Sequence, residues 1–236
     1  MRKTFFIVAF FSSYLFVADN EVSIDQSGAT FNLDVEQLGS GNLIGGSDAI
    51  AGTMTALDLD GATMTLDINQ IGDANKFKGD ITADSFTGFF EFDGDSNVFD
   101  VQIDPNNTFG ADSSNLQVNI TGSSNDMSLD QALSAMASSL DLDWTIQGDT
   151  NTIDADIDID GATNYMNIDG DDNTVNYNGD GFAGGYFHLT HDGNNREITV
   201  TQASTQDNDW LKITSDGNNG TFCIIQNDQG TSTSCP

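Results

Sequence analysis

A short turn motif, Gly-x-x-Asn, recurs along the chain and constrains the fold more than any other feature. The six clear copies run from Gly39 to Asn42, Gly72 to Asn75, Gly94 to Asn97, Gly122 to Asn125, Gly148 to Asn151 and Gly170 to Asn173. Two looser copies follow, with asparagines at Asn195 and Asn219. Successive asparagines are 33, 22, 28, 26, 22, 22 and 24 residues apart. A basic step of about 22 residues, with insertions in the first half, indicates a repeat architecture.

Alternating apolar and polar residues flank these turns, as in Leu66-Asp67-Ile68, Phe90-Glu91-Phe92 and Met166-Asn167-Ile168. This period of two is typical of strands with one buried face. Most copies also place an apolar residue two positions after the asparagine, and often another five before it. A second turn midway, as at Asp160-Gly161-Ala162-Thr163, completes a coil. The sequence therefore predicts an all-β solenoid of about 22-residue strand-turn-strand coils, stacked roughly 4.8 Å apart.

One segment departs from the repeat. Ser128-Leu129-Asp130-Gln131 matches a capping box, and Leu129, Leu133, Met136 and Leu140 would share one helical face. We therefore expect a short inserted helix near 128–140, which covers an apolar part of the stack or, alternatively, docks a partner.

The N-terminus has a basic start followed by an apolar run, which is the pattern of a secretory signal peptide. Residues 1–18 are expected to be this signal, although Phe16 is unusual near its cleavage site and a retained apolar anchor is the alternative. Residues 19–236 would then form one solenoid domain with a C-terminal cap around 205–236. These features predict an extracellular or cell-surface protein.

The charge balance excludes several classes of partner and makes catalysis unexpected. Six Lys and Arg stand against 37 Asp and Glu, giving a net charge of −31, which repels nucleic acid and anionic lipid. Solenoid enzymes on polysaccharides need a cation or metal to stabilise developing charge. Only Lys76, Lys78, Arg196 and Lys212 follow the predicted signal. The chain is therefore not expected to be an enzyme, and no catalytic or cofactor-binding residue is assigned.

Two patterns raise a metal site, and each has a structural alternative. Asp156, Asp158 and Asp160, followed by Gly161, match the opening of an EF-hand loop, so weak calcium binding is one interpretation. The twelfth loop position is Asn167 instead of Glu, and alternating isoleucines favour a strand. His188, His191 and Asp192 could similarly join a metal, but His188 is expected on the polar face of a strand.

Two further expectations concern stability. Cys223 and Cys235 close a terminal loop as a disulfide if the protein is exported, and are free thiols otherwise. Asp73, Asp95, Asp149 and Asp171 occupy equivalent turn positions and are expected to stack and repel one another. Salt or divalent cations would screen this repulsion, which predicts a saline or calcium-containing medium.

Two copies of the motif carry a glutamine before the glycine, Gln37-Leu38-Gly39-Ser40-Gly41-Asn42 and Gln70-Ile71-Gly72-Asp73-Ala74-Asn75. This pattern resembles the curlin repeat of secreted bacterial amyloid fibre subunits over residues 31 to 226. The resemblance implies an extracellular β-solenoid whose coils add end to end into fibres. The other copies lack the glutamine, so the inward Gln ladder of that family is largely absent. Similar arrays also look like those of marine bacteriophage structural proteins.

The resulting expectation is a structural, self-associating fibre or adhesion subunit at the cell surface. The alternative is a structural or receptor- or glycan-binding fibre protein of a bacteriophage virion. A structural subunit should form filaments or join a larger assembly, whereas a binding module should stay monomeric and retain one class of ligand.

Overall fold

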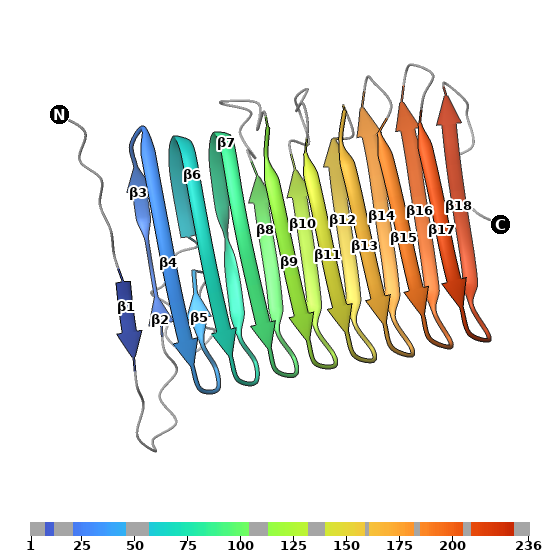
Figure 1. Ribbon diagram of the computed structural model, residues 1–236, viewed down its shortest axis with the longest axis horizontal. Helices are drawn as coiled ribbons and strands as arrows, with labels where there is room; N and C mark the ends of the chain where they lie inside the picture. Colours follow the sequence, from blue (N-terminus) through green and yellow to red (C-terminus); the bar gives the residue numbers. More distant parts are fainter. Residues whose placement is uncertain are drawn as a thin grey trace.

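The computed structural model describes residues 8–11, 21–45, 57–103, 113–131, 140–158, 161–181, 185–204 and 209–228. Those residues form an all-β solenoid of strands and turns and contain no helix (Figure 1). The strands are β1 (Val8–Phe11), β2 (Glu21–Val22), β3 (Asp25–Ser27), β4 (Thr30–Leu38), β5 (Leu43–Ile44), β6 (Leu57–Ile71), β7 (Lys76–Asp93), β8 (Val98–Ile103), β9 (Asn115–Thr121), β10 (Asp126–Gln131), β11 (Asp141–Gln147), β12 (Thr152–Asp158), β13 (Thr163–Asp169), β14 (Thr174–Gly181), β15 (Tyr186–Asp192), β16 (Glu197–Ser204), β17 (Trp210–Asp216) and β18 (Thr221–Asp228).

From β8 onward, strands two apart in the sequence pair in parallel, so the chain winds with one strand of each coil in each of two sheets (Figure 1). We call the sheet that contains the start of β7 and strands β8, β10, β12, β14, β16 and β18 the first sheet. The second sheet contains the end of β7 and strands β9, β11, β13, β15 and β17. The long strand β6 pairs with β3, β4 and β7, and so extends both sheets toward the N-terminus.

The core lies between the two sheets and contains the apolar residues that the sequence places at fixed offsets from the repeat asparagines. The apolar residues two positions after the repeat asparagines stand in register, coil upon coil, and are buried: Ile44, Phe77, Phe99, Met127, Ile153 and Val175. Rings from facing sheets meet across the core, with 4.8 Å between the centroids of Phe77 and Phe90 and 6.1 Å between those of Phe99 and Trp144. Burial of these side chains is the main stabilising contribution.

The longest spacing in the repeat comes from an insertion within a coil. Ile44 pairs with Phe77 and Leu57 pairs with Gly79, so the twelve residues 45–56 follow Ile44 where the neighbouring strand has only Lys78. The 33-residue step from Asn42 to Asn75 exceeds the 22-residue step from Asn75 to Asn97 by 11 residues, which is the length of segment 46–56. The regular coil therefore continues on either side of the insertion, as the spacing predicts.

The alignment of the last two repeat copies needs a correction of one residue. Thr174 pairs with Glu197 and Glu197 pairs with Thr221, which places Arg196 and Gly220, not Asn195 and Asn219, at the asparagine position. Gly193 and Gly217 keep the glycine position. The sequence pattern missed this because asparagine happens to stand one residue earlier in both copies.

The predicted helix near 128–140 is wrong where the structure describes it. Residues 128–131 belong to β10, and Leu129 pairs with Val101 and Ala155 in the neighbouring coils. Met127, Leu129 and Gln131 alternate into the core, so burial on a strand outweighs the capping-box pattern. Residues 132–139, which carry the rest of the prediction, lie outside the described residues.

Part of the predicted signal segment stands at the N-terminal edge of the second sheet. Strand β1 pairs in parallel with Asp34 to Gln37 of β4 (Figure 1). Cleavage or retention of residues 1–18 stays a prediction. Within the described ranges, no helix has the length and apolar character needed to cross a membrane.

Candidate functional site

The Gly-x-x-Asn turns share one backbone geometry that sets the height of the stack. Gly94 has φ 146° and Ser96 has φ 61°, and the same pair of left-handed positions recurs from turn to turn. A Cβ on Gly94 would lie 2.1 Å from the carbonyl oxygen of Gly72 in the preceding coil. Only glycine permits this approach, because any larger residue would overlap the neighbouring turn.

The repeat asparagines form a buried ladder along the solenoid axis. Each donates its side-chain amide to the glycine carbonyl of its own turn, as Asn125 does to Gly122 at 2.7 Å. Between coils, Asn125 Nδ2 donates to Asn151 Oδ1 at 3.0 Å, and the backbone N–H of Asn97 donates to Asn125 Oδ1 at 2.8 Å. The ladder satisfies polar groups that burial would otherwise leave unpaired.

The ladder ends at an arginine. Arg196 replaces asparagine and donates from Nη1 to the Gly193 carbonyl at 2.5 Å, while Nη2 approaches the Gly217 carbonyl at 3.5 Å. Its guanidinium lies 5.3 Å from the centre of the Phe222 ring. Gly220 leaves room for it, because a Cβ there would lie 2.9 Å from Arg196 Nε.

The turn aspartates are hydrogen-bonded to the next coil. The carboxylates of Asp95, Asp149 and Asp171 accept the backbone N–H of Ser123, Asp171 and Asn194, each at 2.6 Å. A charge-assisted bond to an N–H stabilises a carboxylate in this position. The expectation of simple repulsion at the turns therefore overlooked a favourable role for these side chains.

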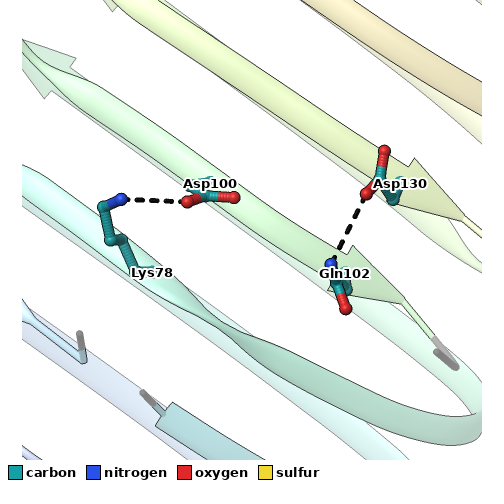
Figure 2. A network of polar contacts seen from close by, with 4 residues as sticks. All are labelled: Lys78, Asp100, Gln102 and Asp130. Carbon is teal, nitrogen blue, oxygen red and sulfur yellow. Dashed lines mark hydrogen bonds and ion pairs between the residues drawn. The ribbon is translucent and has the colours of Figure 1, made fainter. Parts of the chain in front are cut away.

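Like charges gather instead on the outer face of the first sheet, which we call the acidic face. In adjacent coils Asp58 pairs with Asp80, and Asp130 pairs with Asp156. Figure 2 shows two contacts that relieve the charge: Lys78 Nζ lies 2.9 Å from Asp100 Oδ2, and Gln102 Nε2 donates to Asp130 Oδ2 at 3.5 Å. Burial, and then neighbouring carboxylates, raise the pKa of Asp80, Asp130 and Asp154 above the ordinary 3.8.

These raised pKa values predict a destabilising charge on the acidic face at neutral pH. A carboxyl whose pKa is higher in the folded state stabilises the fold below pH 3.8, and this contribution is lost as pH rises through the raised value. Asp130→Asn should therefore raise Tm at pH 7 in low salt. The gain should reach at most about 4 °C, because exposure and screening keep it at about 1 kcal/mol or less. Thermal denaturation followed by circular dichroism measures it.

Glu197→Gln provides a matched control, because Glu197 is an exposed outward residue whose register neighbours are Thr174 and Thr221. Its Tm should change little. The gain of Asp130→Asn should shrink in sea-strength salt and at pH 4. An equal gain under all these conditions would show that charge is not its cause.

The predicted metal residues are not brought together in the described part of the chain. Asp156 lies on the outer face of β12, Asp158 ends that strand, and Asp160 lies outside the described residues. His188 is on the outer face of β15, as expected, whereas His191 is buried in the core, so the two histidines point to opposite sides. No group of three or more His, Cys, Asp or Glu among the described residues could hold a metal. Weak calcium binding stays a prediction.

Cys223 lies in β18 and is disulfide-bonded. Cys235 lies outside the described residues, so the pairing of the two stays a prediction.

The buried imidazole of His191 predicts a second pH effect. Burial, followed by the nearby charge of Arg196, lowers the pKa of His191 below 6.5. Its neutral form thus stabilises the fold above pH 6.5, and this contribution is lost as pH falls through the lowered value. His191→Ile, which matches Ile168 of the preceding coil, should raise the free energy of unfolding by about 1–2 kcal/mol at pH 5 and by less at pH 8. Urea denaturation at the two pH values checks this, and a gain independent of pH would contradict it.

The outer face of the second sheet carries aromatic side chains that the sequence pattern did not single out. Phe89, Tyr165 and Trp210 are 43%, 45% and 43% exposed. They come from β7, β13 and β17, so only the register of the coils shows that they share one face. The sequence did contain one indication of them: these aromatic residues stand at outward-facing positions of the apolar–polar alternation, where small polar residues predominate.

The last coil leaves core positions uncovered. Phe222 and Ile224 of β18 are 40% and 49% exposed, whereas Ile198 and Val200, their register partners in β16, are fully buried. Among the described residues no later strand pairs with the outer edge of β17 or β18. This end of the stack has the polar and apolar groups that an additional coil would cover.

No family model, curated protein or solved structure matches this chain.

Proposed function

We propose that the protein is a secreted, non-enzymatic structural subunit that associates end to end through its terminal coils, at the cell surface or in an extracellular fibre. The observation that carries the proposal is the exposure of Phe222 and Ile224, which occupy core positions of the repeat but are covered by no further coil among the residues that the structure describes. A second copy that stacked on this end would bury them and pair the edges of β17 and β18.

The opposite end supports the same mode of association. The edge of β4 accepts a parallel strand at Asp34 to Gln37, the position that β1 occupies in this chain. Removal of residues 1–18 with the predicted signal would free this edge. Strands at both ends run parallel to their neighbours, so a head-to-tail contact would continue the register of the stack and could repeat without limit.

Ile224→Lys tests the contact, because a charged side chain at this end disfavours burial under a second copy. We expect the chain that starts at Asp19 to form large species in saline buffer as its concentration rises. Ile224→Lys should shift assembly to at least tenfold higher concentration, about 1.4 kcal/mol per contact. Sedimentation velocity measures both.

Thr214→Lys is the control. Thr214 is exposed on the outer face of the same coil, and its replacement by lysine adds the same charge as Ile224→Lys. It should assemble as the natural chain does. A natural chain that stays monomeric at every concentration, or an Ile224→Lys variant that assembles equally well, would contradict the proposal.

A further inference from the structure

An open trough of about 510 Å³ lies on the outer face of the second sheet. Phe89 of β7 lines one end and Tyr165 of β13 the other, and their rings are about half exposed. Between them, β9 and β11 contribute amide and carboxylate side chains. A volume of this size falls within the range of sites for small ligands.

The coil register explains why a hollow forms here. Phe89, Gln117, Asp143 and Tyr165 occupy one line across four successive coils. Beside it, Asn115 and Asp141 stand between Thr87 and Thr163. Two large rings therefore flank two coils of shorter polar side chains, which form the floor of the trough. Phe89 also lines a second hollow of about 270 Å³ with Asp67 and Asn119, so the depression continues past the ring.

The aromatic surface extends beyond Tyr165 toward the C-terminal end. The Tyr165 ring centroid lies 5.5 Å from that of Tyr186. Tyr186 stacks on Trp210 with 4.0 Å between centroids and 6° between ring planes. The trough and these rings form a strip that runs along the solenoid axis. Aromatic rings that are exposed in such a line do not contribute to the packing of the core, which favours a role for the strip as a recognition surface.

We propose that this strip binds a neutral, extended glycan chain that lies along the solenoid axis. The flat, apolar faces of pyranose rings pack on exposed Phe, Tyr and Trp rings, and sugar hydroxyls hydrogen-bond with amide and carboxylate groups such as those of Asn115, Gln117 and Asp143. One sugar of an extended β-linked chain is about as long as one coil step of roughly 4.8 Å, so successive sugars meet successive coils.

Charge selects a neutral glycan over an acidic one. Asp141 and Asp143 line the floor, and the chain as a whole carries a net charge of −31. Uronic acids, sulfated sugars and sialic acids would meet repulsion on approach and in the trough. A peptide strand is the weaker candidate, because the outer face has its backbone groups already paired within the sheet and offers no edge for a strand to join.

The test is isothermal titration with cellohexaose and fully N-acetylated chitohexaose as neutral β-linked probes, and a β-(1→4)-linked mannuronate hexamer as the acidic probe. The protein carries Ile224→Lys in all samples, so that binding is measured whether or not the chain assembles. We expect saturable binding of at least one neutral probe and none of the acidic one. Tyr165→Ala and Phe89→Ala should each weaken the Kd about tenfold, as loss of about 1.4 kcal/mol of ring contact would.

Ile71→Ala is the matched control, because Ile71 is an exposed apolar residue, 39% exposed, that does not line the trough. Its Kd should equal that of the parent, and circular dichroism should show the same fold in all variants. Absence of binding to both neutral probes overturns the proposal, as does a Tyr165→Ala variant that binds like the parent. Tighter binding of the acidic probe would also overturn it. Failure of assembly in the sedimentation test leaves these outcomes unchanged.

Discussion

Replacing Asn125 with alanine is expected to lower the free energy of unfolding by about 3–5 kcal/mol. The change removes the bond to the Gly122 carbonyl at 2.7 Å and the bond to Asn151 Oδ1 at 3.0 Å. It also leaves the buried N–H of Asn97 without its acceptor, Asn125 Oδ1. Unpaired buried groups account for most of the loss, since they forgo hydrogen bonds to water in the folded state. Urea denaturation at pH 7 measures the change.

Asn119→Ala is the comparison that isolates the ladder. Asn119 is an asparagine of β9 that faces outward and is only half buried. Its replacement should change stability by about 0.5 kcal/mol or less. Equal losses at the two positions would show that the ladder contributes nothing specific.

Replacing Gly122 with alanine is expected to be more damaging, at more than about 4 kcal/mol, because no local movement accommodates the methyl group. Its Cβ would lie 2.1 Å from the carbonyl oxygen of Gly94, and the residue has φ 133°, which L side chains rarely adopt. Separation of the two turns would break the hydrogen bond from Gly94 N to the Thr121 carbonyl as well. The expected result is a fall in soluble, β-rich protein, measured by yield and circular dichroism.

Gly28→Ala is the control for this substitution. Gly28 lies in the turn between β3 and β4, its φ is outside the left-handed region, and a Cβ there would meet only Gln26 Nε2 at 3.3 Å. This variant should fold as the natural chain does. A Gly122→Ala protein with unchanged stability would contradict the close stacking of the turns.

The sequence predicted the coils because the repeat combines two independent signals. The spacing of asparagines located the turns, and apolar residues at fixed offsets, such as Phe99 and Ile120, placed the strands in a common register. Parallel pairing of equivalent residues then follows, since only one register buries every apolar side chain. Insertions did not obscure the pattern, because the register of the regular coil holds on both sides of segment 46–56, where Ile44 pairs with Phe77 and Leu57 pairs with Gly79.

The errors arose where a local pattern competed with the stack. The capping box at 128–131 is a helix signal, but stacking of Leu129 between Val101 and Ala155 decides the conformation. Arg196 was missed at the asparagine position because its role depends on reaching carbonyls in two coils, which no spacing rule describes.

The aromatic strip could not be found from the sequence alone. Phe89, Tyr165 and Trp210 are far apart in the chain, and each by itself is an ordinary exposed residue. They become neighbours on one surface only when the register of β7, β13 and β17 is known. The exposure of the C-terminal coil could not be predicted from the sequence either. Phe222 and Ile224 continue the same apolar–polar alternation as the buried core residues Ile198 and Val200.

Electron microscopy and fibre diffraction of the chain that starts at Asp19, in saline buffer, test the central claim most directly. End-to-end stacking predicts unbranched filaments with strands perpendicular to the filament axis and an axial reflection near 4.8 Å. Ile224→Lys should suppress these filaments, and Thr214→Lys should preserve them. Particles that remain single solenoids at high concentration, or filaments that the Ile224→Lys variant forms equally well, would contradict the account.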